Sequence, residues 1–132
     1  MLSSDETMTT STVHLEIPAS GEYLAVARAA ATGLAAQLHF TYDEIDDLRI
    51  AVDEACGQLM ARRAGADTIR VVYHMDDGEL WVEVSVDATD RSGPLERDTF
   101  AWQILNAMTD EVVEKAGDGR LALRFRKHGG QR

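Results

Sequence analysis

Five short runs in which apolar and polar residues alternate constrain the fold of this chain more than any other feature. Because successive side chains of a strand point to opposite faces, each run predicts a strand with one apolar and one polar face. One face of the resulting sheet must be covered, while the other can remain in water. The runs are VHLEI (13–17), TIRVVYH (68–74), LWVEVSV (80–86), DEVVEK (110–115) and RLALRFR (120–126).

Three segments with helical spacing can cover the apolar face. Each repeats apolar side chains every three or four positions, and they span residues 22–38, 41 to about 63, and 98–109. In the second segment, Thr41 and Glu44 have the spacing of a capping box, which predicts the helix start. In the third, Asp98 or Thr99 is the expected cap. The residues of this third helix expected to face inward are Phe100, Ile104, Leu105 and Met108.

Two hairpins complete the expected architecture. Asp77-Gly78 lies between the second and third runs, and residues 116–119 lie between the last two; both predict tight turns. We therefore expect a two-layer α/β sandwich with a five-stranded, mostly antiparallel (mixed) sheet and three helices on one face. Residues 12–128 form the expected single domain, between a disordered tail at 1–11 and a short C-terminal tail at 129–132.

Composition excludes several classes of function. A net charge of −10 argues against binding a nucleic-acid backbone, which requires a basic face. The most apolar window, residues 25–38, is too short for a membrane span and contains Arg28. The single cysteine, Cys56, excludes a disulfide framework, and with no export signal we expect a cytoplasmic protein. The four histidines lack ligand spacing, so no metal site is expected.

The segment TYDEIDDLRIAVDEACGQLM, followed by a hairpin and a helix reading ILNAMTDEV, resembles bacterial anti-sigma factors of the serine-kinase type. The pattern D-x-x-x-A-V-x-E-A-C over Asp47 to Cys56 carries the resemblance most specifically, and it extends over residues 13–127. It implies the histidine-kinase-like ATPase (GHKL) fold. It also implies two partners, a sigma factor and a STAS-type anti-anti-sigma antagonist, and leaves a homodimer open.

The resemblance also implies an ATP site whose first two parts are altered here. In the family, a glutamate and an asparagine one turn later serve as general base and magnesium ligand; this chain has Glu54 and Gln58. An aspartate at the end of a strand reads adenine, but strand parity places Val86 there and turns Asp87 to the other face. A bulge that shifts the register by one residue would turn Asp87 inward, and Asp87 could then contact the adenine. The first glycine after this aspartate is replaced by Ala88 or Thr89.

The third part of the family's ATP site is a flexible lid followed by a glycine-rich turn that enters a helix. Only about a dozen residues are available for the lid, and the turn reads Thr99-Phe100-Ala101-Trp102, without glycine. Loss of two or three charge-assisted contacts, at ~1.5–3 kcal/mol each, removes ~3–9 kcal/mol from a micromolar site that is only ~8 kcal/mol deep. We therefore expect no cofactor; ATP and magnesium would bind only if the divergent site still works. Trp102 is expected to fill the space of the phosphates.

Three interpretations of function remain open. The chain is an anti-sigma factor acting by sequestration, a working serine kinase that uses Glu54, Gln58 and Asp87, or a partner of a STAS protein alone. Asp46, Asp47 and Asp53 form either a solvated acidic face or a contact for basic side chains of a partner. On the polar sheet face, Trp81 either serves an interface or is covered by a loop or tail.

Overall fold

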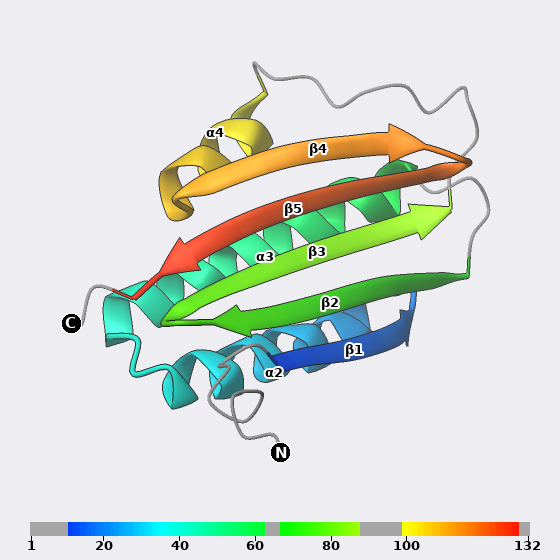
Figure 1. The fold of residues 1–132 in the computed structure, drawn as a ribbon. Coiled ribbons are helices and arrows are strands. Elements are labelled where there is room, and N and C mark those ends of the chain that lie inside the picture. The colour runs from blue at the N-terminus through cyan, green and yellow to red at the C-terminus, as the bar shows by residue number, and fades with distance from the viewer. Residues whose placement is uncertain (1–10, 63–66, 88–98, 130–132) are drawn as a thin grey trace.

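One antiparallel sheet and three helices form two layers in the computed structural model, which describes residues 11–62, 67–87 and 99–129 (Figure 1). The strand order is β1-β2-β3-β5-β4. The strands are β1 (Ser11–Pro18), β2 (Thr68–Asp76), β3 (Glu79–Asp87), β4 (Glu111–Gly117) and β5 (Arg120–His128). The helices are α2 (Leu24–Gln37), preceded by the short 3₁₀ turn η1 (Gly21–Tyr23), α3 (Tyr42–Arg62) and α4 (Phe100–Met108).

The helices lie together on one side of the sheet and leave its other side open, which confirms the expected two-layer sandwich (Figure 1). All four strand pairs among the described residues are antiparallel, so the sheet is not mixed. Strands β3 and β4 run in the same direction, but β5 lies between them and is antiparallel to both.

The strand parity read from the sequence is observed throughout the central sheet. Ile69, Val71 and Tyr73 of β2 are fully buried, and so are Leu80, Val82 and Val84 of β3. The Tyr73 hydroxyl donates a hydrogen bond of 2.8 Å to the Ala27 carbonyl, tying the sheet to α2. Three fully buried alanines of α2, Ala27, Ala31 and Ala35, lie in this core. The buried stripe of α3 is Leu48, Ala51, Val52, Ala55, Cys56 and Leu59.

The two predicted hairpin turns are confirmed by their backbone angles. Asp77 and Gly78 have φ values of 51° and 82°, and Asp118 and Gly119 have 56° and 74°. Two successive residues with positive φ are typical of the tight turns that match the twist of antiparallel strands. Glycine at the second position adopts this conformation without steric cost.

The starts of α3 and α4 are set by side-chain caps. The Thr41 amide donates to Glu44 Oε1 at 2.7 Å, and the Glu44 amide donates to Thr41 Oγ1 at 3.2 Å, which confirms the capping box. In α4 the cap is Thr99, whose hydroxyl accepts from the Trp102 amide at 3.2 Å. The expectation that Phe100 faces inward is wrong, because it is 75% exposed. Trp102 faces the core instead. Because Phe100 is two positions before it, about 200° of helical rotation away, Phe100 points to solvent.

Candidate functional site

The candidate general base lies on one flank of α3. Asp47, Glu54 and Gln58 are spaced by seven and four residues within this helix, which places them on one side of it. Glu54 and Gln58 are half-buried. This flank of α3 faces β5 and the end of α4. The ammonium of Lys127 in β5 lies 3.3 Å from Asp47 Oδ2 and 3.0 Å from the Met108 carbonyl at the end of α4. The two side chains that the family would use are therefore one turn apart, toward β5 and α4.

The end of β3 presents an apolar side chain at the position that the sequence resemblance assigns to the aspartate contacting adenine. Val86 is 1% exposed and belongs to the core. Asp87 is exposed on the other face, where its carboxylate lies 3.4 Å from the Arg70 guanidinium. The ladder with β5 continues without interruption from Val86–Leu121 to Asp87–Arg120. No bulge therefore turns Asp87 inward within the described part of β3.

The start of α4 contains the residues that the sequence resemblance aligns with the glycine-rich turn. The Thr99 side chain is used as the helix cap, and Ala101 is half-buried. Trp102 is 7% exposed, as expected for a side chain that fills space beneath the helix. The lid positions, together with Ala88, Thr89 and the alternative cap Asp98, lie outside the described residues.

The three acidic residues considered for partner binding do not form one face. Asp46 and Asp53 share one flank of α3, whereas Asp47 lies on the flank of Glu54. Each pairs with a basic side chain of the same chain. The pairs are Asp46–Arg49 at 3.2 Å, Asp47–Lys127 at 3.3 Å and Asp53–Arg28 at 2.8 Å. The Asp46 side chain is 61% exposed, which leaves it the most accessible of the three.

Sequence reasoning missed the two basic partners from other elements. Arg28 of α2 and Lys127 of β5 are 25 and 80 positions from their aspartates. Arg28 carried a signal, since it is the only charge in an alanine-rich helix. Lys127 carried one as well. In an alternating strand it occupies a position of core parity, and a lysine there requires a partner.

Cys56 is packed rather than reactive. Burial, with a smaller contribution from the nearby Asp53 carboxylate, raises the pKa of the Cys56 thiol to about 12, and Arg28 opposes the shift. A thiol that stays protonated at neutral pH is a poor nucleophile. This agrees with its place in the buried stripe of α3.

Neither a cluster of metal-ligand residues nor a membrane-spanning helix occurs in the part of the chain that the structure describes. No group of three or more His, Cys, Asp or Glu side chains there could hold a metal ion. None of the described helices combines the length and apolar character required to cross a bilayer.

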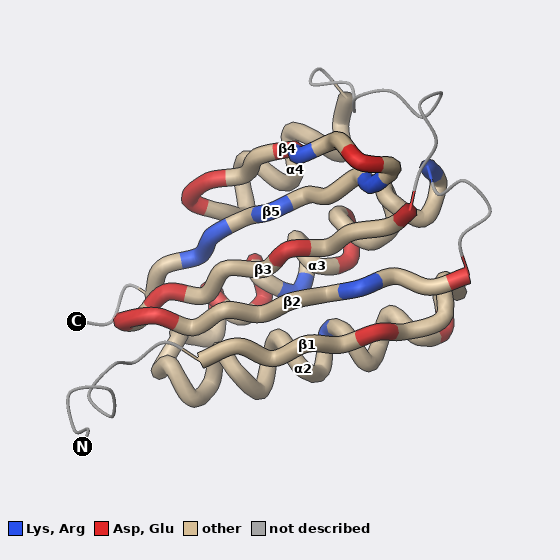
Figure 2. Tube along the Cα trace, turned by 45° about the vertical axis from the view of Figure 1, so that its right-hand side comes forward, with Lys and Arg blue, Asp and Glu red and all other residues tan. Residues whose placement is uncertain are grey.

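Charge is distributed unevenly between the two layers (Figure 2). Helix α3 contains six acidic and two basic residues. Strand β5 contains four basic residues and no acidic one. Acidic residues therefore dominate the long helix, and basic residues gather along a strand near the centre of the sheet.

Comparisons with known proteins agree with this architecture. A serine-protein kinase RsbW of Halalkalibacterium halodurans is 30% identical over 113 residues, covering 85% of this chain and 67% of that protein. The RsbW of Bacillus anthracis is 32% identical over 75 residues, covering 55% of this chain and 47% of that protein. The chain thus aligns with between about half and two thirds of each relative. No family model matches it.

A solved structure supports the fold independently. The crystal structure of the RsbU and RsbW domains of a Mycobacterium tuberculosis protein superimposes with a TM-score of 0.70 at 16% identity, covering 90% of this chain and 32% of that one. The histidine-kinase-like ATPase fold expected from the sequence is therefore confirmed. Together with the 30% identity over most of its length, this places the chain in the RsbW family of serine-protein kinases, the anti-sigma factor family that its long helix resembles.

Proposed function

We propose that this protein is an anti-sigma factor that binds a sigma factor, keeps it from RNA polymerase, and releases it to a STAS-type antagonist without efficient phosphoryl transfer. Its membership of the RsbW family supports the two partner classes. The observation that carries the non-catalytic part is the end of β3, where Val86 is buried in the core and Asp87 is paired with Arg70 on the opposite face.

The residues present do not fit a nucleotide in the manner of the family. A buried valine can neither accept nor donate a hydrogen bond, so the adenine amino group would lose its acceptor on entering the site. Thr99 is already used as the cap of α4, and residues 99–102 contain no glycine. Gln58 is one methylene longer than asparagine, and magnesium demands near-ideal octahedral geometry. These replacements favour binding of a partner over binding of ATP.

The acidic surface of α3 fits a sigma factor, whose DNA-binding and polymerase-binding surfaces are basic. Opposite charges steer association and act mainly on the on-rate. Asp46 is the best probe of this surface, because it is the most exposed of the three aspartates and pairs with Arg49, which is exposed on the same helix. Asp46→Lys should slow association with the sigma factor at low salt more than it speeds dissociation, if this flank is the interface. Asp47→Lys is a poorer probe, since it would place two ammonium groups beside each other at Lys127.

A working kinase is the second candidate, and one observation favours it. Glu54 and Gln58 remain one turn apart on the same flank of α3, the arrangement that a general base and an amide ligand require. In a working kinase, Glu54→Gln removes the proton acceptor and should lower phosphorylation of the antagonist by ~10²–10⁴-fold. In the protein we propose, the same change leaves partner binding unaltered.

The test begins with the protein purified from its native cytoplasm together with what it binds, identified by mass spectrometry. A sigma factor and a STAS protein are the expected partners. The nucleotide site is then tested by adding ATP and magnesium to the protein in increasing amounts and measuring its melting temperature. We expect no stabilisation at micromolar ATP. Saturable stabilisation in that range, together with phosphate transfer to the STAS protein that Glu54→Gln abolishes, would establish the kinase instead.

A further inference from the structure

The open face of the sheet carries a stripe of arginines. Arg120, Arg124 and Arg126 alternate along β5 with the buried Leu121, Leu123 and Phe125, so all three point away from the helices. Figure 2 shows the basic positions spread along the full length of β5. In a chain of net charge −10, such a concentration of one sign is a surface feature that solubility does not require.

Two of these arginines form no ion pair with a carboxylate of the described residues. Arg126 lies 3.2 Å from Glu79 and 3.4 Å from Glu111, which neutralise it. For Arg120 and Arg124, no carboxylate of the described residues lies within ion-pair distance. The Arg120 guanidinium donates to Ser85 Oγ at 2.9 Å, and the Arg124 guanidinium stacks 4.3 Å above the Trp81 ring. Both contacts orient the guanidinium groups. The carboxylates opposite them in the β3–β5 ladder, Asp87 and Glu83, pair instead with Arg70 and Lys115.

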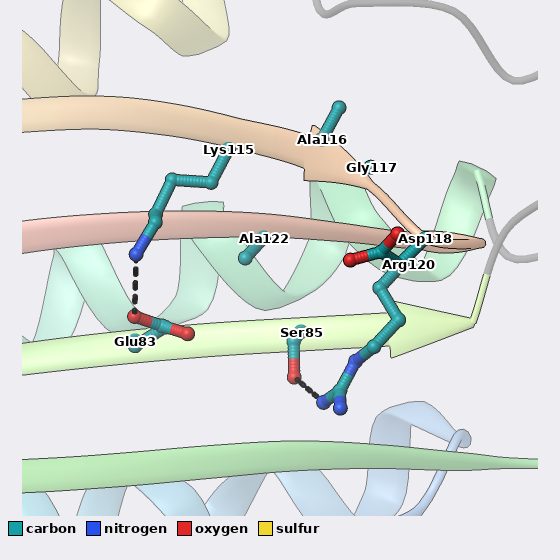
Figure 3. A pocket seen from close by; sticks show the side chains of 8 residues that line it. All are labelled: Glu83, Ser85, Lys115, Ala116, Gly117, Asp118, Arg120 and Ala122. Carbon is teal, nitrogen blue, oxygen red and sulfur yellow. Dashed lines mark hydrogen bonds and ion pairs between the residues drawn. The ribbon is translucent and has the colours of Figure 1, made fainter.

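The surface between these arginines is hollowed. One hollow of about 340 Å³ lies over β5 at Ala122, whose small side chain leaves space between Ser85 and Lys115 in the neighbouring strands (Figure 3). A second hollow, of about 240 Å³, is bordered by Trp81 and Arg124. The two share Glu83 as a lining residue and so adjoin each other. We call this surface, formed by Trp81, Ser85, Lys115, Arg120, Ala122 and Arg124, the arginine groove.

We propose that the arginine groove binds an acidic, extended segment of a partner protein, with one carboxylate at Arg120 and a second at Arg124. Four residues of a strand span about 13 Å, so an extended segment reaches both guanidinium groups with acidic residues four positions apart. Arginine forms bidentate pairs with carboxylates, and Trp and Arg are enriched among the residues that dominate binding energy at interfaces. The Trp81 ring and Ala122 offer apolar contact between the two charges.

Acidic residues beside the groove favour spaced carboxylates over a continuous polyanion. Glu83 lies 3.9 Å from Lys115, and Asp118 lines the same hollow as Arg120. A nucleic-acid backbone would bring phosphates against both carboxylates. Because the groove lies on the sheet face opposite α3, this inference does not rest on the proposed function.

Titration of the full chain, isotopically labelled for NMR, with a synthetic peptide tests the proposal. The peptide is about twelve residues of Ser, Thr and Val with two Glu four positions apart, about 13 Å when extended, and the control peptide carries Gln instead. We expect the Trp81 indole and the side-chain signals of Arg120 and Arg124 to shift with the Glu peptide only. The double variant Arg120→Gln, Arg124→Gln should weaken binding about tenfold or more. Arg49→Gln, the same change on exposed α3, should leave it unaltered.

Ala122→Leu fills the hollow without changing any charge and should also weaken binding of the Glu peptide. This second variant keeps the proposal testable if the double variant folds poorly. Equal binding of the Gln peptide, or equal weakening by Arg49→Gln, would overturn the proposal. Equal shifts with inorganic phosphate would reveal a free-anion site only. Self-association of the unliganded chain that the double variant abolishes would assign the groove to a second copy instead.

Discussion

Lys127→Met removes a side chain that joins three elements of the helical layer and the sheet. The Lys127 side chain is 12% exposed, and its ammonium contacts Asp47 of α3 at 3.3 Å and the carbonyl of Met108 at 3.0 Å. A hydrogen bond to a charged group contributes ~1.5–3 kcal/mol, and the Asp47 contact belongs at the lower end because that carboxylate is 37% exposed. We expect the free energy of unfolding to fall by about 2–3 kcal/mol.

The corresponding change in melting temperature follows from the size of the chain. An unfolding entropy of ~2.1 cal/mol/K per residue gives ~0.28 kcal/mol/K for 132 residues, so Tm should fall by about 7–11 °C. Differential scanning calorimetry and urea unfolding both measure this loss. The matched control is Arg49→Met, which breaks an ion pair whose side chains are 52% and 61% exposed and should cost less than ~0.5 kcal/mol.

A double-mutant cycle isolates the contact with Asp47. Lys127→Met and Asp47→Asn, combined, should destabilise by at least ~1 kcal/mol less than the sum of the two single variants, because either change alone breaks the pair. Additive effects, or a Lys127→Met variant as stable as Arg49→Met, would show that the ammonium is solvated and does not tie β5 to α3.

Three further predictions concern the core and the helix starts. Tyr73→Phe should cost about 1 kcal/mol in urea unfolding, since it removes a buried bond to a helix carbonyl that keeps its own backbone partner; a neutral effect would contradict the hydrogen bond. Thr41→Ala should cost about 1 kcal/mol, and much less in a Glu44→Ala background, because the two side chains cap the same helix end. Cys56 should resist iodoacetamide up to pH 9 and react once urea unfolds the chain. Because its folded pKa is raised from 9.0 to about 12, the unfolded thiol ionises first, and stability should fall as pH rises above 9.

Local chemistry made much of the fold predictable from the sequence. The Asp77-Gly78 turn requires two positive φ angles, a demand that few residue pairs meet, so its residues identify the hairpin. The spacing of Thr41 and Glu44 identifies the start of α3 for the same reason: the reciprocal bonds need those side chains at that distance. Strand parity fixed the inward direction of Val86, because a one-residue slip would have turned the whole apolar set of β3 to solvent.

Contacts between distant segments could not be predicted in the same way. The pairing of Lys127 with Asp47 depends on how β5 crosses α3, which no local pattern encodes. The direction of Phe100 depended on the rotation of a nine-residue helix whose apolar residues nearly encircle it, and tertiary packing chose Trp102 for the core. The two flanks of the acidic residues of α3 follow from their spacing along the helix. The basic partners of Asp53 and Asp47 come from α2 and β5, and no local pattern encodes them.

Transcription in vitro, from a promoter that depends on the sigma factor recovered with the protein, tests the central claim most directly. The purified chain is added in stoichiometric amount to that sigma factor, before core polymerase and without preincubation with ATP. Sequestration without phosphoryl transfer predicts that transcription falls to background, that the STAS-type antagonist restores it, and that Glu54→Gln changes neither result. Undiminished transcription for every sigma factor of the source organism would contradict the account.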